Sequence, residues 1–273
     1  MNQVPTFTPI APFGAWIEQI DLEHPFTNEV VDALRAAFDE HHLLVVRAPG
    51  LSPEGQQRLA AVFGPLLDES RDGSGFTLVS DRPGGSIREG ALLFHSDLAF
   101  TPTPLVAISL YALEIPSGGT CTHFADAAAA ASRLSPSTTA AIGTREAVHV
   151  YPLTDARGDR RFRVATVDAD APRAAHPVLM SHPRTKEPVL YVNQMQTDGI
   201  TGLDEPASEA LLTELWTALY APENVYTHHW CEGDLVVWDN LAVQHARDDV
   251  VLGSGRTLRR VPVGTYAVQL RDT

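Results

Sequence analysis

Cysteine and long apolar runs are scarce in this chain. Cys121 and Cys231 are its two cysteines, too few for a disulfide framework, and we expect both thiols to be reduced. The sequence shows no N-terminal apolar stretch with a basic flank and no uninterrupted apolar run of about 18 residues. Secretion and membrane spanning therefore have no support, and we expect a cytoplasmic protein.

Positive charge is also in short supply. The 273 residues include 20 Lys and Arg against 34 Asp and Glu, which gives a formal net charge of −14 with neutral histidines. Such a chain repels nucleic acid and anionic lipid surfaces and lacks the basic stripe that binds polyanions. An anionic small molecule must therefore be captured by individual side chains, and we expect no nucleic-acid or membrane partner.

The 44% hydrophobic content is that of an ordinary globular protein. Helical signals occupy 28–40, with Thr27 as N-cap, the segment from Ser52 and Pro53 to Gly64, the alanine-rich stretch after Asp126, and 208–219. Short strand signals separated by turns predict a mainly β sandwich or barrel with flanking helices in one domain, 1–273. These strand signals lie at 42–47, 104–114, 120–125, 146–151, 188–193, 225–230, 234–238 and 260–269.

The segment 66–92 has little periodicity and is rich in Asp, Ser, Gly, Arg and Pro. A stretch of this length without regular structure is uncommon in a compact domain unless it covers a binding site. We therefore predict an active-site lid around 66–92, formed by a long loop or by paired short strands, with an ordinary surface loop as the alternative.

Three side chains suit a metal site. His95 and Asp97 are two residues apart on an extended segment and so point to one face, and His245 follows the strand signal at 234–238 after a turn. Two histidines and one carboxylate leave open positions on a metal, which is the arrangement that non-haem Fe(II) uses to bind a cosubstrate and O₂.

Two arginines follow His245 at regular spacing. Arg256 and Arg260 lie 11 and 15 residues after it and would share a face of a strand, with Arg259 facing the other way. A guanidinium recognises a carboxylate through two parallel hydrogen bonds, which lysine cannot reproduce. The alternative for each arginine is a surface ion pair.

These features together resemble the taurine dioxygenase family of Fe(II)- and 2-oxoglutarate-dependent oxygenases. The resemblance spans nearly the whole chain and implies a distorted jelly roll, or double-stranded β-helix, with iron held by His95, Asp97 and His245. It further implies that Arg256 binds the distal carboxylate of 2-oxoglutarate and that Arg260 binds an anionic group of the substrate. The segments that carry it are 14–18, Phe63-Gly64, Phe94-His-Ser-Asp97, Ser117-Gly-Gly119, 124–126, Tyr191-Val-Asn193, the 233–245 run and the two arginines.

The chain departs from the family pattern at two positions. Cys121 stands where the family has a threonine that contacts 2-oxoglutarate, counted from the Gly-Gly pair, whereas counting back from 124–126 selects Thr122. We favour Thr122, because a hydroxyl donates to a carboxylate better than a thiol. Glu69 replaces the histidine that faces the sulfonate in the taurine enzyme, which makes taurine a doubtful substrate.

Other polar residues receive weaker assignments. Asn193 is expected to line the substrate pocket, and Trp238 to pack behind the metal. We expect the remaining histidines, including His123, His149 and the oppositely facing His228 and His229, to be packing or surface residues.

The sequence thus predicts an oxygenase that hydroxylates a C–H bond of a small anionic or zwitterionic substrate, with release of succinate and CO₂. Its cofactors would be Fe(II), 2-oxoglutarate and O₂. We expect Glu69 and Arg260 to mark opposite ends of the substrate pocket. The alternative is a metal-binding jelly roll without oxygenase activity, either a zinc hydrolase or a small-molecule binder. A homo-oligomer is compatible with the sequence.

Overall fold

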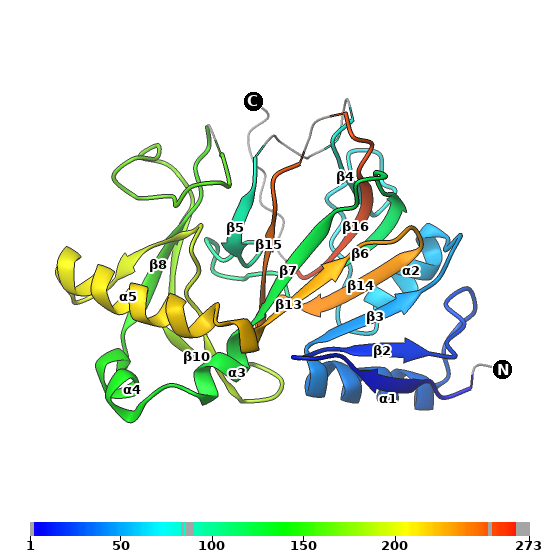
Figure 1. The fold of residues 1–273 in the computed structure, drawn as a ribbon, viewed down its shortest axis with the longest axis horizontal. Helices are drawn as coiled ribbons and strands as arrows, with labels where there is room; N and C mark the ends of the chain where they lie inside the picture. Colours follow the sequence, from blue (N-terminus) through cyan, green and yellow to red (C-terminus); the bar gives the residue numbers. More distant parts are fainter. Residues whose placement is uncertain (1–2, 83–84, 86–89, 155, 251–252, 266–273) are drawn as a thin grey trace.

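The computed structural model describes residues 3–82, 85, 90–154, 156–250 and 253–265 of the chain. Its largest element is a seven-stranded sheet, in which the parallel pair β2–β3 is flanked by antiparallel neighbours (Figure 1). In spatial order the strands are β1 (Thr6–Pro9), β2 (Ala15–Glu18), β3 (Leu43–Arg47), β14 (Asp234–Asp239), β6 (Ala107–Glu114), β16 (Thr257–Val263) and β4 (Thr77–Ser80).

A four-stranded antiparallel sheet faces the larger one. Its strands in spatial order are β13 (Val225–His229), β7 (Cys121–Asp126), β15 (Val243–Arg247) and β5 (Leu92–His95). Phe124 and Val243 from this sheet pack against Leu43, Ile108 and Trp238 from the larger sheet. The two inner faces thus form one apolar core, as in the double-stranded β-helix expected from the sequence.

Helices cover the outer face of the large sheet. α1 (Asn28–His41) and α2 (Pro53–Ala60) bury Leu34, Phe38 and Leu59 against Leu44 and Val237, which alternate along their strands with the inner residues. The predicted caps are confirmed, because Thr27 accepts from the Val30 amide and Ser52 from the Gly55 amide. Burial on both faces explains why β3 and β14 are continuous apolar runs.

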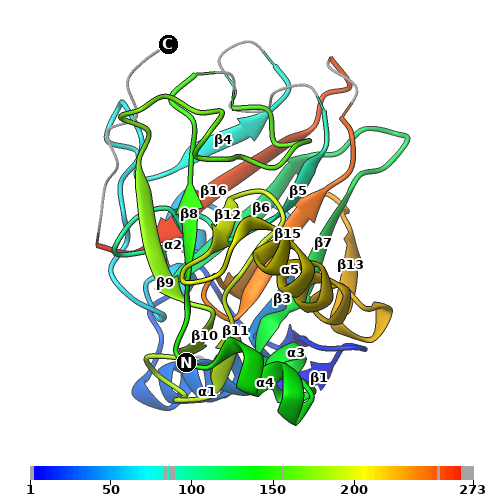
Figure 2. The ribbon, with the colours of Figure 1, turned by 90° about the vertical axis from the view of Figure 1, so that its left-hand side faces the viewer.

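A third layer flanks the small sheet, and Figure 2 views the molecule from this side. It contains the three-stranded sheet β12–β8–β9, the β10–β11 hairpin and four helical segments. The helix expected after Asp126 is α3, and Asp126 caps it by accepting from the Ala128 and Ala129 amides. The elements are β8 (Glu146–Val150), β9 (Arg173–Pro177), β10 (Leu179–Ser181), β11 (Pro188–Leu190), β12 (Thr197–Ile200), α3 (Ala127–Ser132), α4 (Pro136–Ile142), α5 (Glu205–Leu219) and the 3₁₀ helix η1 (Pro222–Asn224).

Several boundaries differ from the sequence expectation. The strand predicted at 260–269 is β16 and begins at Thr257, while 266–269 lies outside the described residues. The short strands β1, β2, β9, β10 and β12 and the helix α4 were not predicted, and His245 lies within strand β15 instead of after a strand end. Part of the predicted lid, 77–80, is β4, which pairs with β16, whereas 83–84 and 86–89 are outside the described residues. None of the helices in the described ranges has the length and apolar character needed to cross a bilayer.

Candidate active site

His95 and His245 are directly opposite each other on two paired strands. β5 ends at His95, and the β5–β15 register sets this residue against His245. The two ring centroids are 4.1 Å apart. Antiparallel pairing therefore brings together two imidazoles that are distant in sequence.

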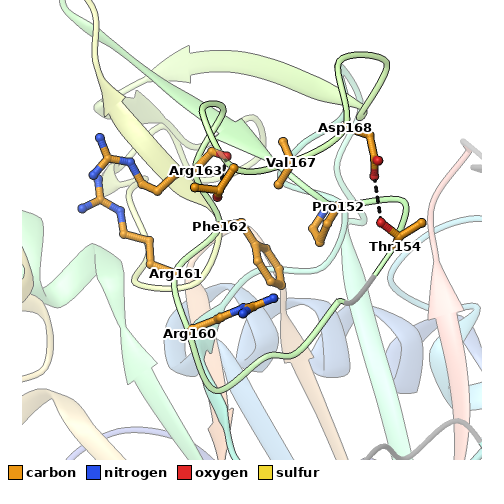
Figure 3. A pocket seen from close by; sticks show the side chains of 9 residues that line it. Pro152, Thr154, Arg160, Arg161, Phe162, Arg163, Val167 and Asp168 are labelled. Atoms are coloured by element: carbon orange, nitrogen blue, oxygen red, sulfur yellow. Dashed lines mark hydrogen bonds between the residues drawn. The ribbon is translucent and has the colours of Figure 1, made fainter.

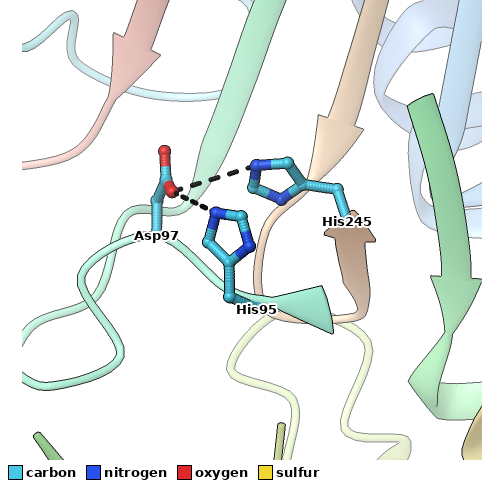
Figure 4. Close-up of side chains that lie close together, drawn as sticks. All are labelled: His95, Asp97 and His245. Carbon is cyan, nitrogen blue, oxygen red and sulfur yellow. Dashed lines mark ion pairs between the residues drawn. The ribbon is translucent and has the colours of Figure 1, made fainter. Parts of the chain in front are cut away.

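Asp97 completes the cluster from the turn after β5. Its Oδ1 atom lies 3.4 Å from His95 Nε2 and 3.9 Å from His245 Nε2, and Figure 4 shows both rings directed at the carboxylate. The prediction that these three side chains converge is confirmed, and the three donor atoms lie within 4.8 Å of one another.

The protonation pattern suits a metal ligand set. His95 Nδ1 lies 2.9 Å from the Leu93 carbonyl oxygen, so an Nδ1–H donor leaves the Nε2 lone pair facing the cluster. Burial and the neighbouring His95 lower the pKa of His245 to about 3, which keeps its ring neutral. Burial acts to raise the pKa of Asp97, but Arg260 and the two histidines outweigh it and hold that pKa well below its usual value. The donor set is thus two imidazoles and one carboxylate, which fits Fe(II).

Asn240 holds the turn that carries Asp97. Its Oδ1 accepts from the Asp97 amide at 2.9 Å, and its Nδ2 donates to the carbonyl oxygens of Asp97 at 3.0 Å and Leu105 at 2.9 Å. Sequence analysis gave Asn240 no role, although its place in the 233–245 run was the available signal. Trp238 packs beside His245, with ring centroids 4.9 Å apart, as predicted.

Arg260 and Glu69 lie together next to the candidate metal ligands. The Arg260 guanidinium donates to Asp97 Oδ2 at 2.8 Å through Nη2 and pairs with Glu69 through Nη1. The expectation that Glu69 and Arg260 mark opposite ends of a pocket is therefore wrong, because the β4–β16 pairing and the preceding loop bring Glu69 onto Arg260. Although burial acts to lower it, the two carboxylates raise the pKa of Arg260 above its ordinary value.

Arg256 occupies a different environment, just before β16. Its side chain is only 2% exposed, and its Nε donates to Thr120 Oγ1 at 3.1 Å. Within the part of the chain that the structure describes, Nη1 has no hydrogen-bond partner and the guanidinium forms no ion pair. Burial, with the nearby Arg247, lowers the pKa of Arg256 to about 10. A buried cation is stabilised by an anion, and the Nη1 group can donate a hydrogen bond to it. The residues present therefore fit a bound dicarboxylate.

Thr122 and Asn193 are buried and already hydrogen-bonded. Thr122 Oγ1 accepts from Trp230 Nε1 at 2.9 Å, which leaves its hydroxyl hydrogen available, while the hydroxyl that touches Arg256 is that of Thr120. Asn193 uses its side chain within its own turn, bonding Gln196 at both ends of the amide. Contacts of Thr122 with 2-oxoglutarate and of Asn193 with substrate stay predictions. Arg259 faces α2, as expected, where its Nε donates to Gln56 Oε1 at 2.7 Å.

A cavity of about 510 Å³ lies apart from this cluster, within the 152–168 segment. Figure 3 shows Arg161 and Arg163 extending together to one side of it. Both pair with Glu209 on α5, at 2.7 and 3.2 Å, so they attach the segment to the helix. The segment adjoins β5 through the Leu93 amide, which donates to the Gly158 carbonyl. None of the metal-ligand candidates lines this cavity, and it is not the candidate site.

Comparison with known proteins identifies the class. The model of the family described as taurine catabolism dioxygenase TauD, TfdA family matches residues 6–261. The (S)-phenoxypropionate/alpha-ketoglutarate-dioxygenase of Sphingobium herbicidovorans is 29% identical over 253 residues, covering 86% of each chain. The alpha-ketoglutarate-dependent 2,4-dichlorophenoxyacetate dioxygenase of Cupriavidus pinatubonensis is 28% identical over 281 residues, covering 92% of this chain and 95% of the relative. A crystal structure of a taurine dioxygenase from Burkholderia xenovorans superposes with a TM-score of 0.80 at 26% identity, covering 97% of this chain and 92% of that one.

The fold and site define a 2-oxoglutarate-dependent dioxygenase with the jelly-roll fold, as the sequence predicted. The chain belongs to the TauD/TfdA family, whose members use Fe(II), 2-oxoglutarate and O₂. The family gives no support to the alternative of a zinc hydrolase or a noncatalytic binder.

Proposed function

We propose that this dioxygenase hydroxylates a C–H bond of a small organic substrate that carries an anionic group, releasing succinate and CO₂. In this proposal His95, Asp97 and His245 hold Fe(II). Arg256 binds the distal carboxylate of 2-oxoglutarate, and Thr122 contributes its hydroxyl hydrogen to the same cosubstrate. Arg260 binds the anionic group of the substrate.

The buried, unpaired Nη1 of Arg256 carries the cosubstrate assignment. Burying a guanidinium without a counter-charge is costly, so the position favours a ligand that supplies a carboxylate. The bond from Arg256 Nε to Thr120 fixes the plane of the guanidinium, which prepares Nη1 for a carboxylate oxygen.

In this proposal the three ligands fix the position of Fe(II). The imidazoles of His95 and His245 and the carboxylate of Asp97 would provide three ligands to Fe(II), which would leave open positions for the cosubstrate and O₂. When Fe(II) and 2-oxoglutarate are bound, they supply the O₂ activation that oxidises the substrate. The chain itself holds the ligands in place, through the Asn240 clamp and through Trp238 behind His245.

The Arg260–Glu69 pair determines which substrates enter. Since Glu69 already occupies one side of the Arg260 guanidinium, an incoming anion must replace Glu69 there or share the cation with it. A simple carboxylate gains by replacing Glu69, whereas a zwitterion could place its anion on Arg260 and its amine on Glu69. The names of the two relatives, an aryloxypropionate and an aryloxyacetate dioxygenase, support a carboxylate-bearing substrate.

A succinate assay tests this proposal. The purified chain with Fe(II), 2-oxoglutarate and O₂ is screened against aryloxy acids, amino acids, acyl amino acids and sulfonates, together with the uncharged amide of each acid. We expect succinate formation to be stimulated by an acid and much less by its amide. Equal stimulation by acid and amide would overturn the role of Arg260.

The Glu69→Gln variant then separates the two substrate types. Removing the carboxylate frees Arg260 for a simple anion, so the KM for an acid without an amine should fall several-fold. The KM for an amine-bearing substrate should rise instead, because the variant loses the partner of the amine. An unchanged KM for both types would show that Glu69 has no part in substrate selection.

A further inference from the structure

Three metal-binding side chains cluster on the outer face of the small sheet. Strand alternation directs Thr122 and Phe124 of β7 to the core and places Cys121 and His123 on the opposite, partly exposed face. Asp248 follows the end of β15 and lies over them. Cys121 Sγ is 3.0 Å from Asp248 Oδ2, His123 Nε2 is 3.1 Å from Asp248 Oδ1, and Sγ is 3.7 Å from Nε2.

These separations are close to those of a tetrahedral zinc site. Donor atoms bound at about 2.0–2.3 Å from a tetrahedral ion are ~3.3–3.7 Å apart. The sulfur–nitrogen distance already has this value. The two Asp248 contacts are at hydrogen-bond length, which is a few tenths of an ångström shorter than a shared ion requires. Since the Asp248 side chain is largely exposed, it can move by that amount.

His123 is also oriented as a metal-binding histidine. Its Nδ1 lies 2.9 Å from Thr227 Oγ1 on β13, which leaves Nε2 directed at Cys121 and Asp248. Histidine ligands commonly donate the hydrogen on their second nitrogen to such an outer partner, which fixes the ring plane and the tautomer.

The strand register supplies a fourth donor. His229 on β13 is paired directly with Cys121 on β7, so their side chains leave the same face of the sheet. Directly opposed residues have Cβ atoms about 4.5–5.5 Å apart. The exposed His229 imidazole can therefore reach the cluster by rotation about its own side-chain bonds.

We propose that Cys121, His123, Asp248 and His229 form a second metal site, for Zn²⁺, on the opposite face of the sheet from the iron ligands. One thiolate, two imidazoles and one carboxylate suit Zn²⁺ and exclude Mg²⁺ and Ca²⁺, which prefer oxygen ligands. Binding replaces the thiol hydrogen with the metal, and the proton leaves to solvent. The bound ion ties together β13, β7 and the end of β15, the strand that carries His245.

Cobalt titration of the metal-free full-length chain tests the site. Co²⁺ also occupies the His95, Asp97 and His245 cluster, but a thiolate-to-cobalt charge-transfer band in the near ultraviolet requires cysteine. We expect this band to saturate at one equivalent per chain, to disappear when Zn²⁺ is added, and to persist in an Asp97→Ala background. Absence of the band would overturn the proposal.

Matched cysteine variants identify which cysteine binds the metal. Cys121→Ser should abolish the band while the chain keeps its far-ultraviolet circular dichroism, and Cys231→Ser, which alters the other cysteine, should leave it intact. A band that survives Cys121→Ser would overturn the assignment.

Two further variants probe the remaining ligands. Thr227→Val should weaken Co²⁺ binding by about tenfold, because it removes the outer partner of His123. His229→Ala should weaken binding at least as much, and an unchanged affinity would overturn the inclusion of His229.

Discussion

Two histidine pairs in the described part of the chain have different surroundings. His95 and His245 lie 4.1 Å apart by ring centroid and share the Asp97 carboxylate, whereas His149 and His176 lie 5.6 Å apart beside the Tyr191 ring. Burial lowers the pKa of both His245 and His149 to about 3. Burial thus acts on one histidine of each pair, and a carboxylate directed at the Nε2 atoms of His95 and His245 distinguishes the metal-site candidate.

The imidazoles of His149 and His176 contact other polar groups of the protein. His176 Nε2 lies 2.9 Å from the Thr101 carbonyl oxygen, and His149 Nδ1 lies 3.2 Å from Thr197 Oγ1. The first contact fastens β9 to the bend at Thr101, and the second lies within the three-stranded sheet, between the paired strands β8 and β12. A buried histidine pair in this fold can therefore serve packing alone.

Removing the Asp97 carboxylate, which distinguishes the first pair from the second, should have the largest effect on turnover. Asp97→Ala leaves two histidines without a shared anion, as in the second pair, and should lower turnover by more than about 100-fold, since losing even an outer partner of a ligand costs about 10–100-fold. His95→Ala and His245→Ala should do the same. Succinate formation and Fe(II) affinity measure the loss, and His149→Gln is the control that should retain turnover. Normal activity in Asp97→Ala would remove it from the site.

Loosening the Asp97 turn should have the next largest effect. Asn240→Ala deletes three hydrogen bonds that hold this turn, and we expect Fe(II) affinity to fall by about 10–100-fold. Asn193→Ala is the matched control, because that buried amide bonds within its own turn. Equal iron affinity in Asn240→Ala and the parent would show that the turn is fixed without the clamp.

Truncating Arg256 tests whether 2-oxoglutarate binds beside the His95–His245 pair. Arg256→Ala deletes a charge-assisted contact worth about 1.5–3 kcal/mol, so the KM for 2-oxoglutarate should rise at least about tenfold while the KM for the primary substrate changes little. If Arg260→Ala shows this defect instead, the roles of the two arginines are reversed.

The smallest effect concerns pH and the second pair. The His149 pKa is about 3 in the folded chain, against an ordinary value of 6.5, because of burial and the neighbouring His176. Between these values the unfolded chain binds a proton that the folded chain does not, so the free energy of unfolding falls as pH decreases, by up to about 1.4 kcal/mol per pH unit.

Denaturant unfolding of the metal-free protein measures that slope. The experiment is carried out between about pH 4 and 7, where the unfolded and folded chains differ in the protonation of His149. His149→Gln should reduce it, whereas His229→Gln, at an exposed position, should not. An identical slope in parent and His149→Gln would mean that His149 does not contribute to the pH dependence.

Local signals made part of the fold predictable. Thr27 and the Ser52–Pro53 pair marked helix starts because caps act within one turn. Strands buried on both faces, such as β3, appeared as apolar runs. The strand β12, with the sequence Thr-Asp-Gly-Ile, carries no such signal because its pairing with β8 determines it.

The same distinction applies to the sites. His95, Asp97 and His245 were predictable from their residue types and from the family resemblance. The contact of Glu69 with Arg260 joins residues 191 apart, and that of Cys121 with Asp248 joins residues 127 apart. Such contacts depend on strand register, which the sequence alone does not determine.

The position of β14 has a consequence for how the chain folds during synthesis. This strand lies between β3 and β6 in the large sheet, although it comes more than a hundred residues after either of them in the sequence. Until residue 239 has left the ribosome, β3 and β6 each present an unpaired apolar edge, a form prone to aggregation. Because a late strand completes this sheet, the contact order is high and we expect slow folding. The candidate iron ligands His95, Asp97 and His245 then come together only after nearly the whole chain has been made.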